Sequence, residues 1–127
     1  MYKGSCLCGA VTFSVSGALK DPDSCHCRIC RKWSGHYLVS TDIPREALNI
    51  QGAENVTWYH SSEKVRRGFC KICGSNLFFD PVIETDWTAV SMGAFDGKTD
   101  VATNIHIFVS QKGDYYEITD DLPQNER

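Results

Sequence analysis

Several short segments of the chain alternate apolar and polar side chains. In residues 10–16, the side chains of Val11, Phe13 and Val15 fall on one face of an extended chain, and this pattern predicts a half-buried strand. Further strands are expected at residues 37–39, 55–60, 77–79, 87–91, 105–109 and 115–118. Because the strands are short and no amphipathic helix of useful length lies between them, the pattern predicts an all-β domain.

The segments between and after these strands add little regular structure. Thr41 and Asp42, followed by residues 43–47, predict a helix cap and one short helical turn. The polar residues 120–127 are expected to fray. Neither a repeat nor a linker divides the 127 residues, so a single domain spanning 1–127 is expected.

Composition and charge exclude several classes of protein. Hydrophobic residues at 42% and charged residues at 23% are ordinary for a folded domain, so wholesale disorder is excluded. A formal net charge of −3 lacks the basic excess of a general nucleic-acid binder. No apolar run approaches the ~20 residues of a membrane span. Residues 1–6 lack the apolar segment of a secretion signal, so a cytoplasmic location with reduced thiols is expected.

Seven cysteines in three clusters are the strongest chemical signal in the sequence. The clusters are CxC at Cys6 and Cys8, CxCxxC at Cys25, Cys27 and Cys30, and CxxC at Cys70 and Cys73. Closely spaced thiolates favour a borderline-soft ion such as zinc. Structural zinc takes four protein ligands and catalytic zinc takes three, so the seven cysteines divide into two sites. The closed site would consist of Cys6, Cys8, Cys70 and Cys73, with buried free thiols or a disulfide as the alternatives.

The remaining triad, Cys25, Cys27 and Cys30, is expected on a loop, where it can bind one metal ion from one side and leave a coordination position open. Redox-active thiols and plain packing are the alternative interpretations. Basic residues flank both groups and could stabilise the ligand charge, and a solvated basic surface is the alternative. They are Arg28, Arg31 and Lys32 beside the triad, and Arg66, Arg67 and Lys71 beside the CxxC pair.

The three cysteine motifs, taken in order along the chain, resemble the glutathione-dependent formaldehyde-activating enzyme (GFA) family, which also contains centromere protein V. The matching segments are GSCLCGAV at 4–11, CHCRICRK at 25–32 and FCKICGS at 69–75. Residues 104–107 and 116–123 are similar to the closing motifs of that family, so the resemblance covers nearly the whole chain. The chain is shorter than the enzyme that gave the family its name, and Tyr115 and Tyr116 stand where a tryptophan is frequent.

This resemblance implies the β-tent, or Mss4-like, fold, in which antiparallel sheets surround a structural zinc. It implies that Cys6, Cys8, Cys70 and Cys73 hold this zinc and that Cys25, Cys27 and Cys30 bind a second one, for which lability is left open. At the second zinc, the family's catalytic member joins formaldehyde to glutathione and forms S-hydroxymethylglutathione, which is formally carbon–sulfur lyase chemistry. Arg28, Arg31 and Lys32 are then the candidates for a rim that binds the carboxylates of glutathione.

Two other functional classes stay open at this point. The first is a non-catalytic, zinc-stabilised interaction module, and the second is a redox protein that uses the triad. His26 and His106 could act as a proton shuttle or a fourth metal ligand, although a hydrogen-bonded structural histidine is the commoner outcome. The expected partners are a small-molecule thiol such as glutathione and a small aldehyde, with no nucleic acid or membrane, and the oligomeric state is open.

Overall fold

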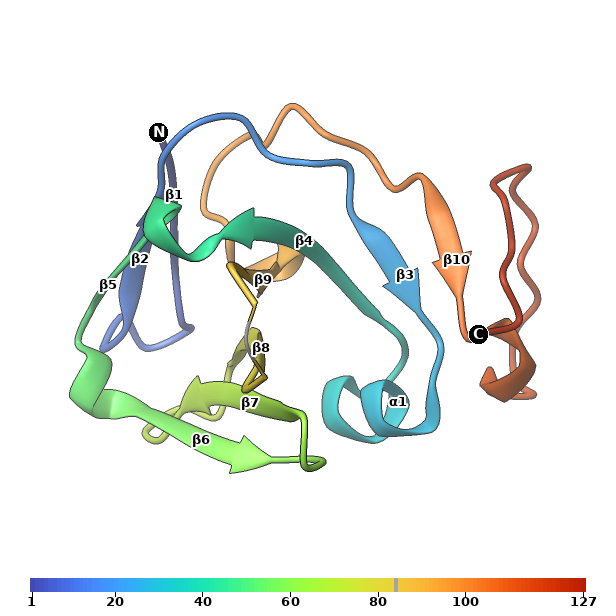
Figure 1. The fold of residues 1–127 in the computed structure, drawn as a ribbon, viewed down its shortest axis with the longest axis horizontal. Helices are drawn as coiled ribbons and strands as arrows, with labels where there is room; N and C mark the ends of the chain where they lie inside the picture. The colour runs from blue at the N-terminus through green and yellow to red at the C-terminus, as the bar shows by residue number, and fades with distance from the viewer. Residues whose placement is uncertain (84) are drawn as a thin grey trace.

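The computed structural model describes residues 1–83 and 85–127, which form two β-sheets and one short α-helix (Figure 1). The smaller sheet has three antiparallel strands in the order β1–β2–β5. These strands are β1 (Tyr2–Ser5), β2 (Thr12–Val15) and β5 (Leu48–Gln51).

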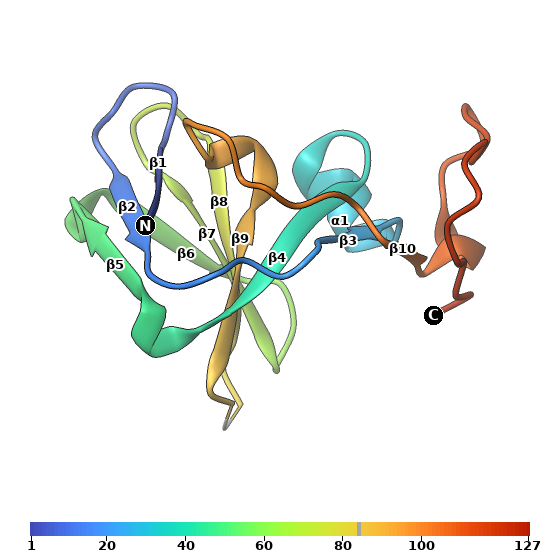
Figure 2. The same ribbon diagram turned by 90° about the horizontal axis from the view of Figure 1, so that it is seen from above.

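The larger sheet has seven strands in the order β10–β3–β4–β9–β8–β7–β6. Its strands are β3 (Asp23–Cys25), β4 (Leu38–Pro44), β6 (Val56–His60), β7 (Val65–Cys70), β8 (Asn76–Pro81), β9 (Trp87–Ser91) and β10 (Ile105–Ile107). Strand β10 pairs with β3 in parallel, and the other neighbours are antiparallel. Figure 2 shows the smaller sheet and the C-terminal segment at opposite ends of the molecule.

Helical structure is limited to short segments. Helix α1 (Arg28–Ser34) ends at Gly35, whose φ of 90° is the left-handed conformation that glycine adopts readily. The 3-10 turns are η1 (Arg45–Ala47), η2 (Ala53–Asn55), η3 (Met92–Ala94) and η4 (Val109–Gln111). Among the described residues, no helix is long and apolar enough to span a membrane.

The hydrophobic core joins the two sheets. Phe13 of β2 meets Phe78 of β8 and Phe95 edge-on, with ring centroids 5.6 and 5.5 Å apart. Edge-to-face packing is favoured because the positive ring edge meets the negative face of its neighbour. Burying a phenylalanine ring contributes about 1.5–3 kcal/mol. Cys6 and Cys70 belong to the same buried cluster, so one cysteine group lies at the border of the core.

Most of the strand predictions are confirmed, one is wrong, and the short helical turn expected at residues 43–47 is confirmed in part. Strands β2, β4, β6, β8, β9 and β10 occur where alternation predicted them. Residues 43–47 are only partly helical, because β4 continues to Pro44 and a 3-10 turn follows. Residues 115–118 form no strand. Instead, the rings of Tyr115 and Tyr116 pack against His36.

The C-terminal residues, which were expected to fray, are hydrogen-bonded to the larger sheet. The backbone N–H of His106 donates to the carbonyl of Pro123 over 2.9 Å, and that of Asn125 donates to the carbonyl of His106 over 2.8 Å. The tail therefore continues the pairing at the β10 edge, which satisfies backbone groups that an open edge would leave exposed.

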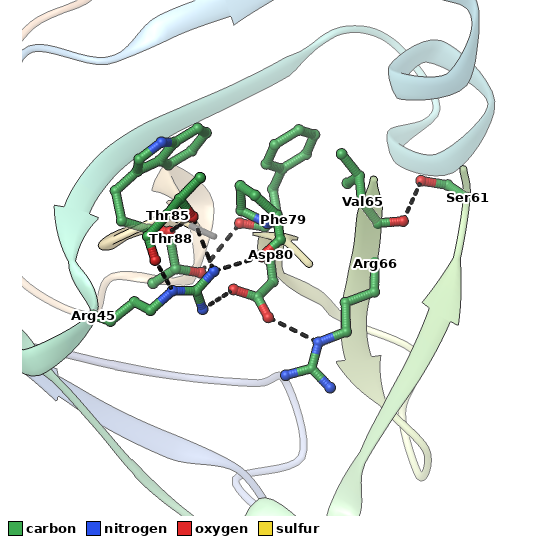
Figure 3. A network of polar contacts seen from close by, with 10 residues as sticks. Arg45, Ser61, Val65, Arg66, Phe79, Asp80, Thr85 and Thr88 are labelled. Atoms are coloured by element: carbon green, nitrogen blue, oxygen red, sulfur yellow. Dashed lines mark hydrogen bonds and ion pairs between the residues drawn. The ribbon is translucent and has the colours of Figure 1, made fainter. Parts of the chain in front are cut away.

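A buried carboxylate ties β7 and β8 to the end of β4. Asp80 is 4% exposed, and it accepts hydrogen bonds from Arg45 Nη1 over 2.5 Å and from Arg66 Nε over 2.8 Å (Figure 3). Because two arginines neutralise the carboxylate, its burial is electrostatically tolerable. Figure 3 shows Asp80 and Arg66 on one side of the sheet and the ring of Phe79 on the other.

Candidate metal centres

Two turns, distant in sequence, bring four cysteines together. Cys6 and Cys8 lie in the turn between β1 and β2, whereas Cys70 ends β7 and Cys73 lies in the turn before β8. Their sulfur atoms all lie within 4.8 Å of one another, although Cys8 and Cys70 are 62 residues apart. The group formed by Cys6, Cys8, Cys70 and Cys73 is called the four-thiol centre below.

The geometry of the four-thiol centre fits a tetrahedral metal ion. The Sγ atoms of Cys6 and Cys8 are 3.6 Å apart, and those of Cys8 and Cys70 are 3.8 Å apart. A zinc–sulfur bond of about 2.3 Å implies sulfur–sulfur separations of about 3.8 Å in a regular tetrahedron. The cysteines are free thiols. The residues therefore fit a closed site for a thiophilic ion.

Backbone N–H groups support the sulfur charge in this centre. The N–H of Val11 donates to Cys6 Sγ over 3.3 Å, and the N–H of Ile72 donates to Cys70 Sγ over 3.4 Å. Gly9, at φ +81°, lies in the first of the two turns and Gly74, at φ +80°, in the second, and glycine adopts this left-handed conformation readily. Hydrogen bonds from the side chain and backbone of Ser75 lower the pKa of Cys73 to about 5.

The other three cysteines form a second group, called the triad, at the junction of β3 and α1. Cys25 is the last residue of β3, Cys27 is the N-cap of α1, and Cys30 lies in its first turn. The Sγ of Cys27 accepts a hydrogen bond from the Cys30 N–H over 3.3 Å. All three sulfur atoms lie within 4.8 Å of one another. The expectation of a loop was therefore wrong, because a strand end and a helix cap hold the thiols in place.

The triad shares its protons unevenly. Hydrogen bonds from Cys25 and Cys30 lower the pKa of Cys27 to about 2, and the helix N–H groups act in the same direction. The contact with Cys27, then the contact with Cys30 and burial, raise the pKa of Cys25. The thiols therefore stabilise one thiolate at Cys27, and binding of a cation would release the remaining protons.

A cavity of about 360 Å³ opens directly onto the triad. Its walls combine the three thiols with the rings of Phe79, Trp87 and Phe108. Asp23 and Asp42 line another part of the same cavity. Cavities with apolar walls and a few polar groups are typical of small-molecule sites. The triad thus faces a space in which a small ligand fits, whereas the four-thiol centre already offers four protein ligands to a metal ion.

One arginine reaches the triad. Arg67 of β7 is 3% exposed, lines the cavity, and donates hydrogen bonds from Nη1 and Nη2 to Cys30 Sγ over 3.5 and 3.6 Å. Its position in the sequence suggested that it stabilises the charge of the CxxC pair. Instead, the alternation of side chains along β7 points it to the triad. Arg28, Arg31 and Lys32 belong to α1, and the described cavity lining includes none of them.

Sequence reasoning missed Arg67, Asp23 and Asp42 as residues of the cavity. Neither Asp23 nor Arg67 carried a usable signal, because neither β3 nor β7 was predicted as a strand. Once β3 is known to be a strand, Asp23 and Cys25, two residues apart, share one of its faces.

His26 and His106 belong to a polar chain rather than to the thiol groups. His26 Nε2 and His106 Nδ1 are 2.8 Å apart, and His106 Nε2 lies 3.0 Å from Asp120 Oδ2. At the other end, His26 Nδ1 bonds to the hydroxyl of Tyr116. Neither ring belongs to a described group of potential metal ligands. This series of hydrogen-bonded side chains connects the C-terminal segment to β10 and to the residue that follows β3.

The fold and the two thiol groups define a small, mostly β domain with two cysteine groups able to bind a metal ion, one of which opens onto a cavity. Residues 1–111 match the family model described as "Glutathione-dependent formaldehyde-activating enzyme". The chain belongs to this GFA family, and its two-sheet architecture is the Mss4-like fold of that family.

Relatives and a solved structure agree with this assignment. The chain is 27% identical over 118 residues to an uncharacterized lyase of Schizosaccharomyces pombe, covering 91% of this chain and 84% of the lyase. It is 36% identical over 90 residues to a Halomonas elongata protein named "Putative glutathione-dependent formaldehyde-activating enzyme", covering 64% of this chain and 57% of that protein. A crystal structure of a Rhodobacter sphaeroides protein superposes with a TM-score of 0.65 at 25% identity, covering 77% of this chain and 91% of that chain.

Proposed function

We propose that the chain is a zinc-dependent enzyme of the carbon–sulfur lyase type, which joins a small-molecule thiol such as glutathione to a small aldehyde such as formaldehyde. The observation that carries the proposal is the triad at the mouth of a 360 Å³ cavity. Family membership and the names of the relatives support the reaction type. The four-thiol centre would hold a structural zinc.

The triad supplies a donor set for a zinc ion with three protein ligands, an arrangement that leaves a position for substrate. Bound there, zinc would supply the Lewis acidity that lowers the pKa of a substrate thiol. The substrate sulfur then attacks the aldehyde carbon and forms the carbon–sulfur bond. The carbonyl π electrons move to oxygen, which takes up a proton equivalent to the one released by the thiol. With formaldehyde, the product is the S-hydroxymethyl adduct of the thiol, a hemithioacetal.

The chain's own residues provide the surroundings of this reaction. The rings of Phe79, Trp87 and Phe108 give the cavity an apolar lining, which would limit the water around the reacting atoms. Arg67 places a buried positive charge beside Cys30. Arg28, Arg31 and Lys32 lie on α1 outside the cavity lining, so any contact with substrate carboxylates would be made outside the cavity.

Replacing Cys27 with serine tests this function. Serine is a good helix N-cap, so α1 should form and the four-thiol centre should stay intact. We expect zinc content to fall from two ions to one per chain and adduct formation from ¹³C-formaldehyde and glutathione, followed by NMR, to fall to the uncatalysed rate. Ser62→Ala, which changes a hydroxyl in another wall of the cavity, is the matched control and should keep both zinc ions. Unchanged adduct formation in Cys27→Ser would refute the proposal.

The same protein distinguishes the redox alternative. A triad that acts by redox chemistry would form a sulfenic acid with peroxide in the zinc-loaded protein, and a dimedone-type probe would label it. We expect no labelling while zinc is bound, because metal coordination occupies the thiolates. Labelling of the zinc-loaded protein without any thiol-dependent loss of aldehyde would favour the redox function.

A further inference from the structure

Arg67 is a buried cation with an unusual partner. Its side chain is turned to the cavity face of β7, where both terminal nitrogens contact Cys30 Sγ and Nε donates to Ser61 Oγ over 3.0 Å. Among the described residues, no carboxylate lies within ion-pair distance of it. Because a buried charge needs compensation, the thiol group is its counter-ion.

Two aromatic rings hold the guanidinium in place. It lies 5.0 Å from the ring centroid of Phe79 and 5.2 Å from that of Trp33. A planar guanidinium stacks on rings more favourably than a lysine ammonium, and the ring faces attract its positive charge. The positive charge of Arg67 is therefore held beside the triad whichever ligand binds in the cavity.

This fixed charge changes which ligands the triad favours. Three thiolates and one divalent cation carry a net charge of −1, which Arg67 offsets. A neutral fourth ligand leaves this balance unchanged, whereas an anionic one adds a further negative charge inside a cavity that Asp23 and Asp42 also line. Arg67 therefore stabilises an anionic fourth ligand relative to a neutral one.

We propose that Arg67 is a specificity-determining residue that makes the triad select thiolates and other anionic ligands over neutral ligands, by compensating charge at Cys30. The inference rests on the proposed function only in that it requires a metal ion at the triad. It extends that function by naming Arg67 as the residue that determines whether the triad prefers anionic or neutral ligands. Arg67 is a positioning residue in this account, because it acts through the triad.

Cobalt(II)-loaded protein tests the proposal without any turnover. The probes are 2-mercaptoethanol, which binds as a thiolate, and imidazole, which binds as a neutral ligand. Binding of each is followed by the visible bands of cobalt and, for the thiol, by added sulfur-to-cobalt charge transfer. We expect Arg67→Gln to weaken binding of the thiol at least about tenfold while the imidazole affinity stays within about twofold. Arg67→Lys, which keeps the charge, should retain most of the preference.

Arg66→Met is the matched control. Arg66 neighbours Arg67 on β7, but its guanidinium pairs with Asp80 on the other side of the sheet and lies over the Trp58 ring. Its replacement removes an arginine from the same strand without changing the charge at the triad. The thiol-to-imidazole affinity ratio should therefore equal that of the wild type.

Several results would overturn the proposal. A wild-type ratio in Arg67→Gln would do so, and so would an equal weakening of both ligands, which would indicate a merely structural role. If Arg67→Gln does not fold, Arg67→Lys decides, because a loss of more than about tenfold in the ratio despite the retained charge contradicts charge compensation. A charge-dependent ratio without aldehyde turnover would refute the proposed function alone, whereas a wild-type protein that binds neither probe would refute both.

Discussion

Cys27 has two roles, because it both begins helix α1 and belongs to the triad. As the N-cap of α1 it accepts a hydrogen bond from the Cys30 N–H, and as a triad member it contributes a thiolate. A helix N-terminus favours negative charge because its free N–H groups point outward. A single residue thus starts the helix and lowers the cost of keeping a thiolate in the triad.

Gly4 shows how a single residue limits the packing between the sheets. A Cβ atom added there would lie 2.2 Å from Phe13 Cζ and 2.5 Å from the carbonyl oxygen of Ala94. We expect Gly4→Ala to lower the free energy of unfolding by about 1–3 kcal/mol, since the added atom forces core side chains and backbone to move. Urea denaturation of the zinc-loaded protein measures the change. Gly97→Ala, where an added Cβ meets nothing within 4 Å, should stay close to wild type, and equal stability of the two variants would contradict the close packing.

His26 gives the protein a predicted sensitivity to acid. Burial, followed by the neighbouring charge of His106, lowers the pKa of His26 to about 4. In the unfolded chain the pKa of a histidine ring is about 6.5. Because the unfolded chain binds more protons between these values, the free energy of unfolding falls as the pH is lowered from about 6.5 towards 4.

Comparing His26→Gln with the wild type isolates this contribution, since protonation of the cysteines affects both proteins. Urea midpoints at pH 6.5 and 4.5 should show a smaller acid-induced loss in the variant. His60→Gln removes an exposed histidine and should lose as much stability as the wild type. Identical losses in His26→Gln and His60→Gln would show that His26 does not carry the effect.

At the scale of elements, β3 and β4 add two carboxyl groups to the cavity that the thiols line. Asp23 and Cys25 share a face of β3, and Asp42 lines the cavity from β4. Burial, and then the charge of Asp23, raise the pKa of Asp42, as expected for two carboxyl groups at one wall. Lys20 offsets part of this charge, but two carboxyl groups against one ammonium leave the wall acidic. The basic residues of α1 lie outside the cavity lining.

This acidic wall predicts a preference among small thiols. Cysteamine, which carries an ammonium group, should bind the cobalt-loaded protein roughly threefold to tenfold more tightly than 3-mercaptopropionate, which carries a carboxylate. Asp42→Asn should reduce this ratio. Asp21→Asn changes an exposed carboxylate of the preceding loop and should leave the ratio unchanged. Tighter binding of 3-mercaptopropionate by the wild type would contradict an acidic wall.

The elements also show where the sequence was informative. Strands such as β2 and β9 were predictable because alternation along a half-buried strand is a local property. Strand β7 could not be predicted in this way, because its sequence VRRGFC does not alternate apolar and polar residues. Its two arginines face opposite sides of the sheet, where Arg66 pairs with Asp80 and Arg67 contacts Cys30. The segment 115–118 has β-forming residues, but its tyrosines pack against histidines, so tertiary contacts outweigh local propensity there.

At the scale of the whole molecule, the grouping of cysteines was predictable and their surroundings were not. The division into four and three followed from ligand number, and the structure brings the same residues together. The cavity, the charge at Cys30 and the histidine chain depend on contacts between distant segments, such as the 37 residues between Cys30 and Arg67. The pattern of apolar and polar residues along the sequence does not predict such contacts.

The four-thiol centre connects the start of the chain to the turn after β7, so it fixes the smaller sheet against the larger one. Removing its metal would leave four thiols around a space at the border of the core. For a small domain, the binding energy of a structural metal is part of the folding energy. The triad lies at one end of β3, so a metal ion bound there would contribute little to this connection.

Stepwise chelation of the zinc-loaded protein, with zinc per chain and circular dichroism recorded together, tests the central claim most directly. The account predicts two zinc ions per chain, of which the triad ion leaves first without change in the dichroism and the four-thiol ion leaves later together with the fold. In Cys27→Ser, only the late ion should be present. A single zinc ion in the wild type, or loss of the fold with the first ion, would contradict the division into an open triad and a closed structural centre.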